Sequence, residues 1–165
     1  MIKIFLFLSV VSISQIAVGQ KNLEQLLEKN NNGSIPYVYV EDVRTWPEEA
    51  VYLDARELPE YEVSHIKDAI FVGYNEFNLK KTTRALVDKS TPIIVYCSLG
   101  VRSEDIGEKL KEAGYTEVFN LYGGIFEWKN AGLEIVNSRQ EITDNVHAFD
   151  KHWGKWLKEG IKVYE

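Results

Sequence analysis

The sequence contains one cysteine, Cys97, and has little else that could cross-link the chain or bind a metal. A single cysteine cannot form an internal disulfide. Three histidines are present, but no group of cysteines and histidines has the spacing of a metal site, and His147 and His152 do not share a helical face. The sequence therefore predicts no metal and no cofactor, and it leaves one free thiol to be explained.

The chain also has fewer positively charged residues than negatively charged ones. The chain has 19 Lys and Arg against 25 Asp and Glu, which gives a formal net charge of −6 at pH 7. This balance disfavours nucleic acid and anionic membrane surfaces as partners. With 165 residues, 45% of them hydrophobic, and no repeat or low-complexity segment, the chain is long enough for one globular domain with its own core.

Long hydrophobic runs are confined to the N-terminus, where residues 1–19 have the pattern of a secretory signal peptide. Lys3 supplies the positive charge, residues 4–11 form the apolar core, and residues 17–19 form a small-x-small cleavage site. The apolar run is short for a membrane anchor and is interrupted by serines, so we expect no stable membrane span after cleavage. We therefore expect an exported protein, located in the bacterial periplasm.

Strand-like and helix-like segments alternate through the middle of the chain. Short runs of β-branched and aromatic residues predict strands, and apolar residues at helical spacing lie between them. This alternation predicts a three-layer α/β fold with a central, mainly parallel sheet flanked by helices. We expect strands at residues 37–40, 51–54, 69–72, 93–96 and 117–120, and helices at 77–88, at 104–114 and from 125 onward.

The expected domain covers residues 37–136. A helical lead-in at residues 20–36 precedes it, and an extension at residues 137–165 follows and is expected to pack on it. Four residues of the extension fall at near-helical spacings and predict an aromatic stripe that docks on the domain: Phe149, Trp153, Trp156 and Leu157.

Cys97 stands at the most informative position in the chain. An apolar strand ends at this cysteine, a short loop containing Gly100 follows, and a segment with helical periodicity comes next. Loop N–H groups and the positive end of the helix dipole would then point toward the sulfur. A cysteine in such surroundings has a lowered pKa, and its thiolate is a nucleophile.

The pattern Cys97-x-x-Gly100-x-Arg102-Ser103 resembles the active-site loop of the rhodanese family of sulfurtransferases. The resemblance extends over about residues 37 to 136, although Ser64 and Asp68 stand where the family often has glycines. Motifs on both sides are similar to the family's, in the same order: Asp54-Ala55-Arg56-Glu57, Glu60-Tyr61 and His65-Ile66-Lys67-Asp68-Ala69 upstream, and Leu121-Tyr122-Gly123-Gly124, Trp128 and Gly132-Leu133 downstream.

The resemblance implies a rhodanese-like fold and sulfur transfer through a persulfide on Cys97. Asp54, Arg56 and His65 are expected to support the loop structurally, and a catalytic role for His65 is disfavoured because sulfur transfer to a low-pKa thiol needs no general base. The substrate-binding loop would comprise Ser98, Leu99, Gly100, Val101, Arg102 and Ser103.

The expected substrates are a small anionic sulfur donor, such as thiosulfate or a persulfide, and a thiol or cyanide as acceptor. Arg102 and the loop N–H groups would hold the anion, and Leu99 and Val101 would shape the mouth of the pocket.

The sequence does not identify the physiological donor, the acceptor, or whether the acceptor is a protein.

Two other functions stay open at this point. One is a phosphatase or arsenate reductase with a Cys-x5-Arg loop, but here Arg102 is the fifth residue after Cys97, and Ser103 stands where that arginine would be. The other is a persulfide carrier or a binding module that engages a partner through residues 137–165. The intact cysteine, glycine and arginine argue against a scaffold without chemistry, but they do not establish turnover.

Overall fold

In the computed structural model, residues 22–46 and 50–164 are described. The chain divides after Asn32 into two compact units, and in the first unit residues 22–30 form a helix. The expected signal peptide at residues 1–19 lies outside the described residues. Among the residues that are described, no helix is both long and apolar enough to cross a bilayer.

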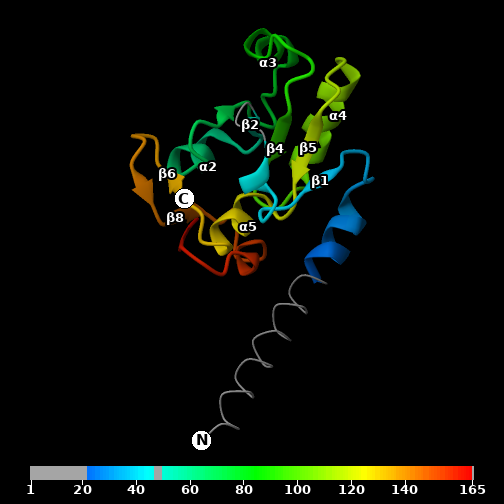
Figure 1. Cartoon of the computed structure of the whole chain (residues 1–165). Helices are drawn as coiled ribbons and strands as arrows, with labels where there is room; N and C mark the ends of the chain where they lie inside the picture. Colours follow the sequence, from blue (N-terminus) through cyan, green and yellow to red (C-terminus); the bar gives the residue numbers. More distant parts are fainter. Residues whose placement is uncertain (1–21, 47–49, 165) are drawn as a thin grey trace, which may run out of the picture. The chain divides into compact units, whose positions relative to one another are not determined.

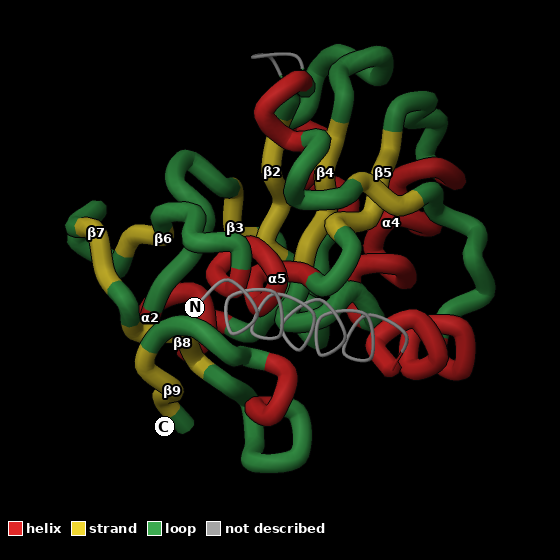
Figure 2. The backbone as a smooth tube through the Cα atoms, turned by 60° about the horizontal axis from the view of Figure 1, so that its bottom comes forward, coloured by secondary structure: helices red, strands yellow, loops and turns green. Residues whose placement is uncertain are grey.

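The second unit contains a five-stranded parallel sheet in the order β1-β5-β4-β2-β3. Figure 2 shows β2, β4 and β5 side by side at its centre. The strands are short and rich in Val, Ile, Leu and Tyr, which suits a sheet covered on both faces. They are β1 (Tyr37–Val38), β2 (Val51–Asp54), β3 (Ile70–Phe71), β4 (Ile93–Tyr96) and β5 (Val118–Leu121).

Helices separate the strands, as the alternation in the sequence predicts (Figure 1). The helix expected at residues 77–88 is shorter at both ends. Asn78 caps its N-terminus by accepting a hydrogen bond from the Lys81 N–H at 3.0 Å, and Leu86, with φ of −109° and ψ of +79°, leaves helical geometry after Ala85. The helical elements of this part are η1 (Val43–Thr45), α2 (Leu58–Val63), α3 (Leu79–Ala85), α4 (Arg102–Glu112) and α5 (Gly124–Asn130).

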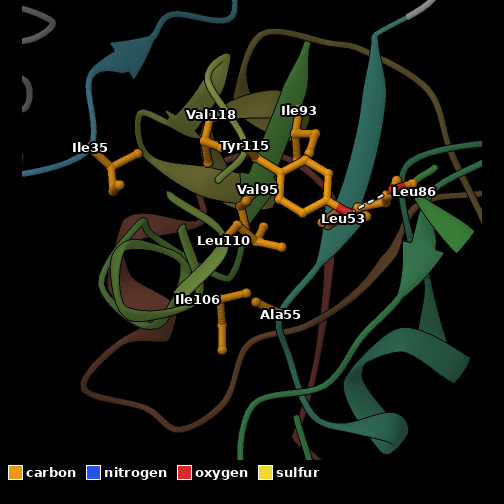
Figure 3. Close-up of a cluster of buried hydrophobic side chains, with 10 residues drawn as sticks. All are labelled: Ile35, Leu53, Ala55, Leu86, Ile93, Val95, Ile106, Leu110, Tyr115 and Val118. Carbon is orange, nitrogen blue, oxygen red and sulfur yellow. Dashed lines mark hydrogen bonds between the residues drawn. The ribbon is translucent and has the colours of Figure 1, made fainter. Parts of the chain in front are cut away.

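The core lies between the sheet and α4. Ile93 and Val95 point from β4 into the same buried cluster as Ile106 and Leu110 of α4. Figure 3 shows this cluster, together with the hydrogen bond of 2.6 Å from the Tyr115 hydroxyl to the Leu86 carbonyl. One face of the sheet is therefore buried against α4.

The opposite face of the sheet is covered by α5. Tyr52 of β2 points to this side and makes an edge contact with Trp128, with ring centroids 5.7 Å apart. With α4 on one face and α5 on the other, the predicted three-layer α/β fold with a parallel sheet is confirmed.

Residues beyond α5 form two small sheets instead of the expected helical stripe. The only helical turn described there is η2 (Gly154–Trp156), and Phe149 is half exposed while Leu157 is buried. Trp153, Trp156 and Leu157 lie in or next to this turn, whereas Phe149 lies before it with φ of +63°, so the helical spacing holds for one turn and does not extend to Phe149. The strands are β6 (Ile135–Val136), β7 (Ile142–Thr143), β8 (Asn145–His147) and β9 (Ile161–Val163), with β6–β7 antiparallel and β8–β9 parallel.

Candidate active site

Cys97 lies immediately after β4, at the carboxyl edge of the central strand, and is 2% exposed. Its Sγ accepts a hydrogen bond of 3.1 Å from the backbone N–H of Gly100. Gly100 has φ of +110°, so its peptide can turn back toward the sulfur in a conformation that other residues rarely adopt. The predicted loop with an inward-pointing N–H group is therefore present.

Asn120 of β5 holds this loop in place from the neighbouring strand. Its Nδ2 donates to the Gly100 carbonyl at 2.8 Å, which orients the amide so that Oδ1 accepts from the Ser103 hydroxyl at 2.7 Å. The Ser103 Oγ also lies 3.6 Å from Cys97 Sγ. Because the hydroxyl carries one proton, it donates to Asn120 or to the sulfur, but not to both at once.

Arg102 and Glu60 form a two-pronged ion pair beside the loop. Nη1 of Arg102 donates to Glu60 Oε2 and Nη2 donates to Glu60 Oε1, each at 2.8 Å. Ser98 joins this pair, since its hydroxyl donates to Glu60 Oε1 at 3.0 Å and accepts from Arg102 Nη2 at 3.1 Å. The pair therefore links α2 to both ends of the cysteine loop, and it is largely withdrawn from water, with the Glu60 side chain 3% exposed.

These contacts favour the charged forms of the thiol and the carboxyl. Burial by itself would raise the pKa of Cys97. The Arg102 charge, the Ser103 hydroxyl when it donates to the sulfur, and the backbone N–H groups of Gly100 and Ser103 outweigh burial, so the pKa of the thiol lies below its ordinary value. Burial would likewise raise the pKa of Glu60, but the hydrogen bonds and charge of Arg102 lower that pKa from 4.5 to about 2. At neutral pH the site therefore holds a carboxylate, a guanidinium and a thiol disposed to ionise.

Asp54 and Arg56 form a second, fully buried ion pair. Arg56 Nη2 donates to Asp54 Oδ2 at 2.6 Å and to the Ser64 carbonyl at 2.6 Å, and Nε donates to Asp54 Oδ1 at 3.0 Å. Both side chains are 0% exposed. The pair connects the end of β2 to the chain after α2, which is the geometry of a structural support.

His65 is buried and has both ring nitrogens engaged. Nδ1 lies 3.0 Å from the Tyr61 carbonyl, so this nitrogen carries the proton, and Nε2 accepts from the Gln140 side chain at 3.2 Å. The ring stacks on Tyr61 with centroids 3.8 Å apart. None of these contacts directs the imidazole at Cys97, so the geometry fits a residue that supports the turn.

The turn after His65 keeps its shape without the glycines common in the family. Asp68 has φ of +62°, so an aspartate occupies the left-handed position where a glycine is usual, and Asp tolerates this conformation better than most residues. Ser64 has φ of −168°, which is extended backbone that any residue adopts. The two departures noted in the sequence therefore leave the local turn intact.

The N-terminus of α5 packs directly on the backbone of the cysteine loop. The N–H of Ile125 donates to the Cys97 carbonyl at 2.9 Å, and the N–H of Phe126 donates to the Ser98 carbonyl at 3.2 Å. A Cβ on Gly124 would lie 2.3 Å from the Cys97 carbonyl oxygen, so glycine is required for this approach. The segment that begins at Gly123-Gly124 therefore supports the cysteine loop directly.

The remaining loop residues differ in their exposure. Leu99 is 3% exposed, about as little as Cys97, whereas Val101 is partly exposed. Within residues 22–46 and 50–164, no cluster of His, Cys, Asp and Glu is placed to hold a metal ion.

Three residues of the site were not assigned a role from the sequence. Glu60 lies in one of the quoted motifs, but its pairing with Arg102 spans 42 positions and has no local signal. Asn120 could have been noticed, because it is a polar residue in an otherwise apolar strand and is 0% exposed. Phe149, whose ring lies over the Arg102 guanidinium with CZ 5.3 Å from the centroid, comes from the extension.

Comparison with known proteins shows the family of this chain. Residues 21–131 match the rhodanese-like domain model. The chain is 34% identical over 82 residues to the thiosulfate sulfurtransferase GlpE of Coxiella burnetii (strain RSA 331 / Henzerling II), covering 48% of this chain and 71% of that protein. It is also 31% identical over 116 residues to the tRNA uridine(34) hydroxylase of Enterobacter sp. (strain 638), covering 68% of this chain but 33% of the hydroxylase.

Solved structures show the same fold. The thiosulfate sulfurtransferase of Pseudomonas aeruginosa superposes with a TM-score of 0.59 at 24% identity, covering 84% of this chain and 26% of that one. A rhodanese-like domain from Anabaena sp. superposes with a TM-score of 0.55 at 23% identity, covering 62% and 79% of the two chains.

Proposed function

This chain belongs to the rhodanese-like domain family, and from that premise we propose that it is a sulfurtransferase working through a persulfide on Cys97. The donor is thiosulfate or a persulfide, and the acceptor is cyanide or a thiol. The observation that carries the proposal is the Cys97 Sγ itself, buried at the end of β4 and bonded to the Gly100 N–H at 3.1 Å beside the Arg102 charge.

In the first half of the proposed cycle the thiolate attacks the outer sulfur of the donor. A new S–S bond forms to Cys97 as the donor's own S–S or S–sulfonate bond breaks, and sulfite or a thiolate leaves with the electron pair. The Gly100 N–H and the Arg102 charge favour a negative charge on the sulfur, and they would act in the same way on the terminal sulfur of the persulfide.

In the second half the acceptor attacks the terminal sulfur of the persulfide. Cyanide leaves as thiocyanate, or a thiolate leaves as a new persulfide, and the electron pair of the broken bond returns to Cys97 as a thiolate. Neither half needs a proton to be removed from carbon, nitrogen or a hydroxyl. The supporting position of His65, with both nitrogens engaged elsewhere, is consistent with such a cycle.

Intact-mass spectrometry tests the proposal. Purified protein treated with thiosulfate should gain one sulfur atom, lose it to cyanide or to a thiol, and the Cys97→Ser variant should gain nothing. Repeated cycles should release thiocyanate in proportion to time. Gain of sulfur without turnover would favour a persulfide carrier, and no gain on a thiol shown to be reduced and accessible would contradict sulfur transfer from thiosulfate.

We also propose that the protein is exported, as residues 1–19 suggest. Support comes from Lys3, the apolar run after it and the small residues at positions 17 and 19. The same mass measurement on protein made in a bacterial host gives its first residue. Cleavage after Gly19 leaves Gln20 at the start, and protein that retains Met1 would argue against export by this route.

A further inference from the structure

The segment formed by residues 145–163 lies against the site, and we call it the C-terminal segment. In Figures 1 and 2, its first strand β8 lies near α2, the helix that carries Glu60. It is anchored on α5, where Asn130 accepts from the Lys158 N–H at 2.7 Å and donates to the Trp156 carbonyl at 3.0 Å. The segment is therefore built onto the domain at two of the elements that hold the cysteine loop.

Residues alternate along the start of this segment as they would in a half-buried strand. Val146 and Ala148 are 0% exposed, while His147 and Phe149 are more exposed. Phe149 on the more exposed side lies over the Arg102 guanidinium, with CZ 5.3 Å from the ring centroid, and Arg102 is paired with Glu60. The side that is not buried in the core therefore reaches one of the ion pairs of the site.

Phe149 is held in an unusual conformation at this place. Its φ is +63°, which is uncommon for a bulky residue. Hydrogen bonds on both sides fix the turn: the Phe149 N–H donates to His147 Nδ1 at 3.2 Å, and Asp150 Oδ1 accepts from the N–H groups of His152 and Trp153 at 2.7 and 2.8 Å. The local structure therefore positions the ring, whose centroid lies 5.3 Å from CZ of Arg102.

The ring combines this contact with free apolar surface. Phe149 is 48% exposed, although one part of it covers the guanidinium that acts on Cys97. Both arginines beside the site are paired with carboxylates, Arg102 with Glu60 and Arg56 with Asp54. An acceptor with a hydrocarbon part can therefore pack on the ring beside Arg102, whereas cyanide has no such part and gains nothing from this contact.

We infer that Phe149 is a specificity-determining residue that selects an organic thiol as the sulfur acceptor over an inorganic ion such as cyanide. This inference rests on the proposed sulfurtransferase function. The organic thiolate R–S⁻ attacks the terminal sulfur of the Cys97 persulfide, the bond between that sulfur and Cys97 Sγ breaks, and Sγ keeps the electron pair as a thiolate. The product is R–S–S⁻, and the hydrocarbon part of R packs on the Phe149 ring.

The test compares two acceptors on protein that has already been loaded with sulfur. Single-turnover rates of sulfur loss are measured with cyanide and with benzyl mercaptan, in the wild type and in Phe149→Ala. We expect the alanine variant to slow the reaction with benzyl mercaptan by about three- to tenfold, the loss of one partly buried apolar contact, and to change the rate with cyanide by less than about twofold.

Two further variants serve as controls. Phe149→Leu keeps an apolar side chain and should retain most of the preference for the organic thiol. Ile161→Ala removes an apolar side chain that is 60% exposed in β9 of the same segment, and it should change neither rate.

The outcomes separate the inference from the function on which it rests. If the wild type never acquires sulfur, the proposed function has failed. If the wild type acquires sulfur but Phe149→Ala slows the reactions with both acceptors by the same factor, the inference is overturned, because the ring then acts only through Arg102. It is also overturned if Phe149→Ala slows neither reaction, because the ring then has no effect on sulfur loss.

Discussion

Replacing Gly124 with alanine should displace the cysteine loop, because α5 and the loop meet backbone to backbone at this residue. The added Cβ would lie 2.3 Å from the Cys97 carbonyl oxygen and 2.7 Å from the carbonyl carbon of Ser98. These are backbone atoms, so no flexible side chain can move aside. The contact can be relieved only if α5 and the loop separate, which lengthens the hydrogen bonds of Ile125 and Phe126 to the Cys97 and Ser98 carbonyls.

The magnitude follows from two contributions. Gly124 has φ of +55°, and an alanine in the left-handed region costs about 1 kcal/mol. Weakening two backbone hydrogen bonds costs about 1 kcal/mol each. We therefore expect Gly124→Ala to lower the free energy of unfolding by about 3 kcal/mol.

Gly132→Ala is the matched control. Gly132 also has a positive φ, of +75°, but no atom lies within 4 Å of the position that its Cβ would take. This variant should lose only the conformational part, about 1 kcal/mol. The difference between the two variants measures the contact of α5 with the cysteine loop.

Urea denaturation followed by circular dichroism gives both free energies, and the rate of sulfur loading from thiosulfate reports on the loop. We expect Gly124→Ala to load at least about tenfold more slowly, since small misplacements of a reacting group have large effects on rate. Equal destabilisation of the two variants, with equal loading rates, would refute the argument that Gly124 is needed for the approach of α5 to the loop.

The ion pair beside the loop gives two further expectations. Arg102→Ala should move the pH midpoint of Cys97 alkylation by iodoacetamide to higher pH, because the guanidinium charge favours the thiolate. Arg139→Ala, which removes an arginine from an exposed ion pair, is the control. An unchanged midpoint in Arg102→Ala would show that Arg102 does not lower the pKa of Cys97. Folding lowers the pKa of Glu60 from 4.5 to about 2, so its carboxylate contributes about 3 kcal/mol of stability at neutral pH that is lost as the pH falls from 4.5 toward 2. Urea denaturation should therefore show that the wild type loses more stability than Glu60→Gln between about pH 6 and pH 3, and parallel losses in the two proteins would contradict this.

Much of the fold could be predicted because strands and helices leave local periodic patterns. The strands at residues 51–54 and 93–96 are found where the apolar runs predicted them, and the alternation with helices indicated a parallel sheet. Helix ends were less predictable. The helix expected at residues 77–88 begins only at Leu79 because Asn78 caps it, and a cap depends on one side-chain hydrogen bond, which periodicity does not detect.

The extension after residue 136 shows where periodicity misleads. Its aromatic residues have spacings close to those of a helix, yet the segment folds as β8 and β9 with one helical turn between them. Their pairing depends on anchoring by Asn130 and on packing at α2, which lie elsewhere in the chain. Local sequence therefore could not distinguish the two structures.

The sequence by itself determined the chemistry that this protein can offer: one cysteine at the end of an apolar strand, a glycine loop after it, and an arginine at the start of the next helix. These are neighbours in the chain, so their geometry follows from local backbone preferences. Only the tertiary structure decided what surrounds them. Glu60 reaches Arg102 across 42 positions, and Phe149 covers the same guanidinium from the extension. Burial and charge depend on which distant segments pack together, and packing is a property of the whole fold.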